Sequence, residues 1–176
     1  MNEAIVEFKK ALEFDPKNVD YHNNLSAVYL TQGKVAEATK EAEAAVKSKP
    51  GQLKAEMNYA NLLLSQKKFV DAQKHYAIVL KAQPKNVEAL ASIAQALREQ
   101  KKLDDAEKQA RAAVEAGPNS ADAHFALAGV LKAKHKDKDA AKQYEWVLKL
   151  KPNHPEASAI KAQIDYLNNK VDPRIP

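Results

Sequence analysis

The chain of 176 residues carries 28 lysines and arginines against 23 aspartates and glutamates, a net charge of +5, and it contains no cysteine. The lack of cysteine excludes disulfides and thiolate metal sites, and no apolar run approaches the roughly 20 residues that a membrane-spanning helix needs. With 29% charged residues, 6% aromatics and four glycines, the composition favours helices with a solvated surface over sheets and tight turns.

Prolines punctuate the chain at a fixed interval of 34 residues, at Pro16, Pro50, Pro84, Pro118 and Pro152. A fixed period of this length, with a proline at each junction, is typical of stacked helical hairpins. The period therefore predicts a core made of a row of small interfaces between neighbouring units.

The first element, residues 1–16, matches only the second helix of such a unit, with Ala4, Phe8, Ala11 and Leu12 at the buried positions. Because no first helix precedes it, we expect the chain to be part of a longer protein. The open apolar end around Phe8 is then a candidate surface for self-association, because exposed apolar side chains favour burial.

Four full units follow, at 19–52, 53–86, 87–120 and 121–154, and together with the ends they are interpreted as a single repeat domain, 1–176. Residues 155–170 are expected to form a C-terminal capping helix, because Lys161 and Asp165 stand where the other units are apolar. Residues 171–176 are expected to be a tail.

Small and apolar residues recur in register within these units. An alanine stands twelve residues before every proline, where a larger side chain would cost about 1 to 3 kcal/mol of overpacking. Apolar pairs four residues apart mark the buried stripe of each first helix. The alanines are Ala4, Ala38, Ala72, Ala106 and Ala140, and the small residues within the first helices are Ser26, Ala60, Ala94 and Ala128.

Turn and cap residues agree with this two-helix unit. Asn18, Asn86 and Ser120 stand two residues after a proline, where a side-chain oxygen can cap the next helix. The hairpin turn keeps a glycine only at Gly33. If the backbone is left-handed at the equivalent Lys67, Lys101 and His135, each costs about 1 kcal/mol relative to glycine.

The periodic prolines, alanines and small residues resemble the tetratricopeptide repeat family over essentially the whole chain. The chain departs from the family at the tryptophan position early in the first helix, which is occupied by His22, Glu56, Leu90 and His124. The resemblance implies an all-α fold, a right-handed superhelix (solenoid) of helical hairpins. It also implies a non-catalytic protein-interaction scaffold.

Motifs for chemistry are missing from the sequence. The five histidines do not stand at metal-ligand spacing, and there is no HExxH, phosphate-binding loop or GxSxG. We therefore expect no enzyme activity, no catalytic residues, no metal and no cofactor.

By the family's geometry, a partner protein or peptide binds the concave face formed by the first helices. Asn24 and Asn58 are equivalent residues there, and such amides can hold a peptide backbone. They resemble the asparagine ladder of some tetratricopeptide superhelices, or they are only consensus residues. The candidate residues are Asn23, Asn24, Leu30, Lys54, Met57, Asn58, Asn61, Leu64, Gln95, Arg98 and Phe125.

Lysines also recur at the hairpin turns, where Lys34, Lys68, Lys102 and Lys136 form a candidate basic edge. An ordinary solvated surface is the main interpretation, and an anionic membrane or protein surface, bound peripherally, is the alternative. Nucleic acid is disfavoured, because acidic residues recur on the concave face.

The leading hypothesis is thus a scaffold that binds a partner segment in its concave groove. Two alternatives stay open: an accessory repeat region of a larger enzyme, presenting substrates, or a self-assembling scaffold on a bacterial membrane or organelle surface, as in magnetosome-type tetratricopeptide proteins. The charged start MNEAIVEFKK does not match a signal peptide, so we expect a cytoplasmic protein.

Overall fold

The computed structural model describes residues 2–169, which form ten helices and no strand. The all-α fold expected from the sequence is therefore confirmed. The helices fall into two compact units, unit 1 at residues 1–84 and unit 2 at residues 85–176. The expected tail, residues 171–176, and residue 170 of the expected cap lie outside the described residues, and the grouping of all repeats into a single domain stays a prediction.

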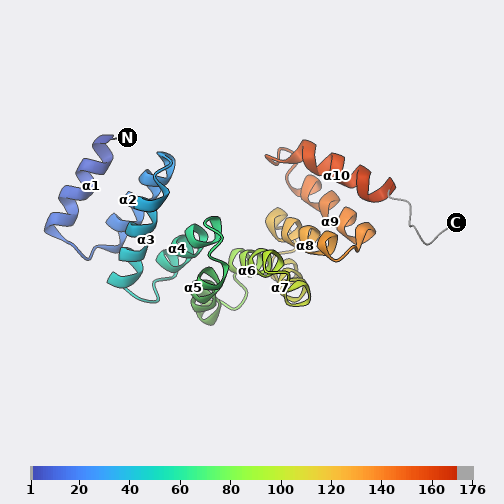
Figure 1. Cartoon of the computed structure of the whole chain (residues 1–176), viewed down its shortest axis with the longest axis horizontal. Helices are drawn as coiled ribbons and strands as arrows, with labels where there is room; N and C mark the ends of the chain where they lie inside the picture. Colours follow the sequence, from blue (N-terminus) through green and yellow to red (C-terminus); the bar gives the residue numbers. More distant parts are fainter. Residues whose placement is uncertain (1, 170–176) are drawn as a thin grey trace. The chain divides into compact units, whose positions relative to one another are not determined.

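Unit 1 contains five helices: α1 (Asn2–Phe14), α2 (Val19–Thr31), α3 (Val35–Ser48), α4 (Leu53–Ser65) and α5 (Phe69–Ala82). Helices α2 and α3 form one hairpin and α4 and α5 the next, while α1 packs on α2 (Figure 1). The side chain of Phe8 is partly buried against this core. The exposed apolar residues of α1 are instead Val6 and Phe14, at 48% and 90%.

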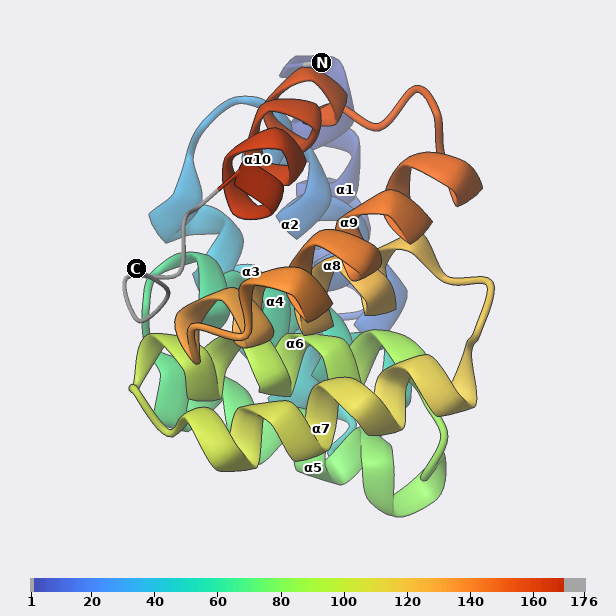
Figure 2. The same cartoon turned by 90° about the vertical axis from the view of Figure 1, so that its right-hand side faces the viewer.

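Unit 2 contains α6 (Val87–Glu99), α7 (Leu103–Ala116), α8 (Ala121–Ala133), α9 (Asp137–Leu150) and α10 (Ala157–Asn169). Helices α6 and α7 lie along each other as a hairpin, as do α8 and α9, and α10 packs on α9 (Figure 2). No helix among residues 2–169 is long and apolar enough to cross a membrane.

Alanine lets the two helices of each hairpin approach closely. Ala38, Ala72, Ala106 and Ala140 have no exposed surface, whereas Ala4 in α1 is half-buried. The small Ser26 of α2 also links the two helices directly, because its Oγ donates a 2.8 Å hydrogen bond to the carbonyl oxygen of Ala38 in α3.

The caps and turns follow the sequence pattern. The side-chain oxygens of Asn18, Asn86 and Ser120 accept hydrogen bonds from backbone N–H groups in the first turns of α2, α6 and α8. The turn residues Lys67, Lys101 and His135 have φ of 60°, 62° and 58°, as Gly33 does at 71°. The left-handed turns expected from the sequence are thus present, with their cost in backbone strain.

In unit 1, polar pairs join the two helices of each hairpin at the family's tryptophan position. His22 Nδ1 lies 2.7 Å from Glu41 Oε2, and its Nε2 lies 3.1 Å from the carbonyl oxygen of Pro16. In the next hairpin the order is reversed: His75 Nδ1 lies 2.6 Å from Oε2 of Glu56, whose side chain is only 1% exposed. A polar bridge therefore replaces aromatic packing.

In unit 2, His124 makes the corresponding bridge to Gln143, with 2.7 Å between Nδ1 and Oε1. The ring of Trp146 stacks on that of His124 at a centroid separation of 5.6 Å, and Lys149 Nζ lies 4.3 Å from the centre of the indole. Trp146, 40% exposed, thus packs on His124 of the preceding helix.

Two glycines of unit 2 are expected to respond oppositely to alanine. A Cβ at Gly117 would lie 2.7 Å from Cγ2 of Val87, a stiff β-branched side chain, so Gly117→Ala should destabilise unit 2 by about 1 kcal/mol. A Cβ at Gly129 would meet the end of the Arg98 side chain, which can swing away. Gly129→Ala should therefore be neutral or stabilise by up to about 1 kcal/mol. Urea denaturation of both variants measures their unfolding free energies. Equal losses of stability in the two variants would contradict this prediction.

Candidate functional site

Unit 1 carries a pocket of about 310 Å³ between α2 and α4. Four of the residues expected from the sequence line it, namely Asn23, Leu30, Asn58 and Asn61. The remaining lining residues are Ser26, Ala27, Leu62 and Ser65. The wall of the pocket is therefore made of amides, hydroxyls and apolar side chains.

A hydrogen-bonding group in this pocket has no partner. Asn58 Nδ2 donates to Asn23 Oδ1 at 3.2 Å, while Asn23 Nδ2 has no hydrogen-bond partner although the residue is only 3% exposed. A buried donor without a partner costs about 1 to 3 kcal/mol. A ligand carbonyl oxygen in the pocket would remove that cost.

The other side chains of the pocket complete this arrangement. Tyr76, fully buried in α5, donates its hydroxyl hydrogen to Asn61 Oδ1, which holds that amide in place. Leu30 is 43% exposed and offers apolar surface beside the amides. The pocket therefore combines hydrogen-bonding groups with an apolar contact.

Some expected residues of unit 1 lie outside the pocket. Asn24 is exposed on α2, and Lys54, Met57 and Leu64 of α4 are not among the lining residues. The amide that faces Asn58 is Asn23, one position before the Asn24 that the ladder pattern selects. The repeat register does not determine which of the two neighbouring asparagines turns inward.

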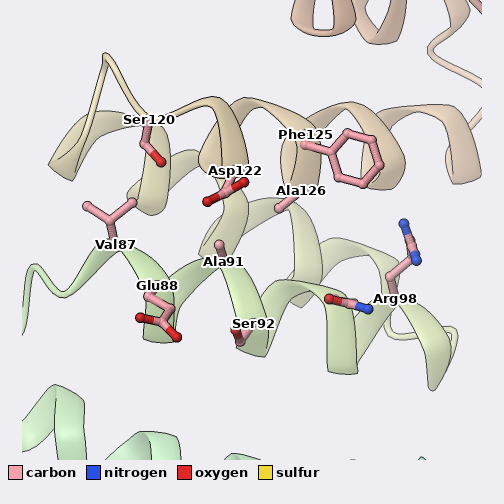
Figure 3. A pocket seen from close by; sticks show the side chains of 10 residues that line it. Val87, Glu88, Ala91, Ser92, Arg98, Ser120, Asp122, Phe125 and Ala126 are labelled. Atoms are coloured by element: carbon pink, nitrogen blue, oxygen red, sulfur yellow. The ribbon is translucent and has the colours of Figure 1, made fainter. Parts of the chain in front are cut away.

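Unit 2 carries a second pocket, of about 480 Å³, between α6 and α8. Figure 3 shows Glu88 and Asp122 on these facing helices, with Phe125 and Arg98 towards the other end. Gln95, Arg98 and Phe125 were expected from the sequence. Val87, Ala91, Ser92, Ser120 and Ala126 also line the pocket.

Arg98 and Phe125 both contact neighbouring side chains. Arg98 donates from Nε and Nη2 to Glu99 Oε1, at 3.2 and 2.7 Å. The ring of Phe125 meets Tyr144 edge-on at 5.9 Å and stacks on His154 at 5.4 Å. Burial raises the pKa of Tyr144, which therefore stays neutral beneath Phe125.

The lysines of the candidate basic edge lie at the N-caps of the second helices α3, α5, α7 and α9. Each of these helices carries acidic residues in its first turn, such as Glu37 and Asp71. Lys34 Nζ lies 6.0 Å from the ring centre of Tyr29, while Lys136 Nζ lies 2.9 Å from Glu107 Oε2. Nearby groups thus compensate part of this charge.

Glu107 is the centre of an ion-pair cluster in unit 2. Its carboxylate lies 2.7 Å from Lys134 Nζ, 2.9 Å from Lys136 Nζ and 2.7 Å from Arg111 Nη2. Hydrogen bonds from Lys134, then Lys136, lower the pKa of Glu107 to about 2. This cluster ties the turn between α8 and α9 to α7. No sequence motif distinguishes Glu107, which stands next to the core alanine Ala106, so the cluster was not predicted.

Within residues 2–169, no group of three or more histidine, aspartate or glutamate side chains is placed to hold a metal ion. His22 and His75 lie in unit 1 and are engaged by Glu41 and Glu56. Their roles are those of helix-bridging side chains.

Known proteins resemble the chain both in sequence and in fold. Two family profiles described as "Tetratricopeptide repeat" match residues 58–121 and 97–164, and one described as "TPR repeat" matches residues 1–33. The comparison with curated proteins gives no match.

Among solved structures, the chain is similar to MamA 41-end from Desulfovibrio magneticus RS-1, with a TM-score of 0.76, 19% identity and coverage of 87% of this chain and 86% of that one. It is also similar to the MamA RS-1 ArsTM double mutant, with a TM-score of 0.75, 19% identity and coverage of 86% and 85%. For pilF of Pseudomonas aeruginosa the TM-score is 0.70, the identity 19% and the coverage 94% and 83%.

These structures share the all-α solenoid of helical hairpins, and the profiles match the repeat pattern at both ends and in the middle of the chain. That fold generally serves as a protein-interaction scaffold. The chain belongs to the tetratricopeptide repeat family.

Proposed function

We propose that the chain is a non-catalytic scaffold that binds an extended segment of a partner protein on the face formed by its first helices. In unit 1 the segment occupies the pocket between α2 and α4. The observation that carries this proposal is that Asn23 lines the pocket and that its buried Nδ2 has no hydrogen-bond partner.

The chemistry of the pocket supports a peptide as its ligand. A backbone carbonyl oxygen accepts from Asn23 Nδ2, while the Oδ1 of Asn58 can accept from a backbone N–H. An apolar side chain of the segment lies against Leu30, 43% exposed. Because backbone groups and one apolar side chain suffice, the pocket recognises a segment with little dependence on its sequence.

The test starts from peptides selected on the whole chain out of a phage-displayed library of random dodecapeptides. Isothermal titration calorimetry then compares the wild type with Asn58→Ala and Leu30→Ala. We expect each substitution to weaken binding about fivefold, the equivalent of one hydrogen bond or a partly buried side chain.

The matched control is Asn24→Ala, an exposed asparagine of the same helix that lies outside the pocket. Its affinity should equal that of the wild type, and circular dichroism should show that all variants are folded. Unchanged affinity in both Asn58→Ala and Leu30→Ala would refute the proposal. A loss in Asn24→Ala alone would instead favour the ladder that the sequence pattern predicts.

A further inference from the structure

The pocket of unit 1 has two anchor points on a single helix, and their spacing identifies the pattern of the bound segment. We propose that the segment lies along α2, with a backbone carbonyl oxygen at Asn23 and an apolar side chain, three residues away in the segment, against Leu30. This inference rests on the proposed function and adds to it the course and the sequence pattern of the partner segment.

The course of the segment follows from the positions of Asn23 and Leu30 in α2. They stand seven residues apart, which is about two turns of an α-helix, so both lie on one helix face with about 10.5 Å between them along the axis. An extended chain rises about 3.1 to 3.4 Å per residue. Three residues therefore span the distance between the anchor points, and the segment runs along α2 instead of crossing from α2 to α4.

Hydrogen bonds within unit 1 distinguish Asn23 from the two serines of the pocket. The hydroxyl of Ser26 donates to the carbonyl oxygen of Ala38, and that of Ser65 donates to the carbonyl oxygen of Leu62, each at 2.8 Å. A hydroxyl has one hydrogen to donate, so neither serine has a donor left for a ligand. Asn23 Nδ2 has no partner, and a carbonyl oxygen of the segment would remove the cost of leaving it unpaired.

The uncharged wall of the pocket sets the chemistry of the segment between the anchor points. The described lining residues are asparagines, serines, leucines and an alanine, and none of them is charged. A charged side chain placed against this wall would lose its water without gaining an ion-pair partner, which is unfavourable for either sign of charge. The segment at the pocket is therefore uncharged, and its apolar side chain lies beside Leu30, which is 43% exposed.

The test uses the tightest-binding dodecapeptide selected on the whole chain. Isothermal titration calorimetry measures two scans of this peptide: one replaces each side chain by alanine, and the other replaces each amide by an ester, whose carbonyl oxygen is the weaker acceptor. We expect one carbonyl and one apolar side chain, three residues apart, each to weaken binding about fivefold when replaced. Lysine and glutamate at the two positions between them should both weaken binding, by about tenfold.

Variants of the chain assign the two peptide positions to the pocket. In Leu30→Ala, alanine at the apolar peptide position should cost less than about twofold, because the side chain has already lost its contact. In Asn23→Ala the same should hold for the sensitive ester. The matched control is Val35→Ala, which removes an apolar side chain of similar exposure, 40%, outside the pocket. It should leave both losses at about fivefold, and circular dichroism should show that the variants are folded.

The spacing keeps the inference testable even if Asn23→Ala does not fold. The wild type alone must show a sensitive ester three residues from the peptide position that is coupled to Leu30. A different spacing, or no peptide position coupled to Leu30, would overturn the inference. If the peptide still binds more weakly to Asn58→Ala in that case, the proposed function stands and only the course along α2 is wrong. Unchanged affinity in both Asn58→Ala and Leu30→Ala would refute the two together.

Discussion

Replacing Glu56 by alanine is expected to destabilise unit 1 by about 3 kcal/mol, because the substitution removes one partner of a buried pair. The carboxylate is 1% exposed, lies 2.6 Å from His75 Nδ1 and accepts a 2.9 Å hydrogen bond from the backbone N–H of Gly51. All of these groups would lose their partner. Hydrogen exchange of the α4 and α5 amides, compared between wild type and variant, measures the loss within the unit concerned.

The repeat itself supplies the control. In unit 2 the equivalent position is Leu90, 6% exposed, and the residue equivalent to His75 is Gln109. The double variant Glu56→Leu with His75→Gln therefore copies a combination that the fold already accommodates. It should recover most of the stability, because an apolar replacement of similar volume often matches a buried pair. A loss of stability in the double variant as large as that in Glu56→Ala would contradict this account.

Glu107→Gln is expected to destabilise unit 2 at pH 7 by on the order of 1 to 2 kcal/mol. The carboxyl has a pKa of about 2 in the folded chain against an ordinary value of 4.5. A lowered pKa stabilises the folded state above the ordinary value, and this stabilisation is lost as the pH falls towards 2. The exposure of Lys136 and Arg111 reduces the effect through solvent screening.

The measurement is urea denaturation of wild type and Glu107→Gln at several pH values. The difference in unfolding free energy between the two proteins should be constant from pH 7 to about pH 5 and should shrink between about pH 4.5 and pH 2. The control is Glu115→Gln, which replaces an exposed residue of the same helix. Its unfolding free energy should differ little from that of the wild type at any of these pH values. If the difference in unfolding free energy between wild type and Glu107→Gln stayed the same from pH 7 to pH 2, the ion-pair cluster would be excluded as its cause.

The repeat register predicted the helices and their contacts well because every unit imposes the same local requirements. The period predicts the buried alanines Ala72 and Ala106, the helix cap at Asn86 and the left-handed turn at Lys101. The structure contains all of these features. These features depend on residues within one hairpin, so one period of sequence contains the information.

The candidate binding face was less predictable, because it depends on contacts between hairpins. The sequence pattern makes Asn24 the equivalent of Asn58 in the adjacent unit, and in the structure the residue that contacts Asn58 is the neighbouring Asn23. A rotation of a fraction of a turn about α2 decides between neighbouring residues, and the repeat pattern does not fix such a rotation. The Glu107 cluster was missed for a similar reason, since Lys134 and Lys136 reach it from the following hairpin.

The stacking of Trp146 on His124 has a consequence for spectroscopy. Trp146 is the only tryptophan of the chain and lies in unit 2, whereas unit 1 contains the tyrosines Tyr21, Tyr29, Tyr59 and Tyr76. Selectively excited indole emission therefore reports on one half of the molecule, from a ring stacked on an imidazole. Melting curves recorded by emission and by ellipticity describe different parts of the same protein.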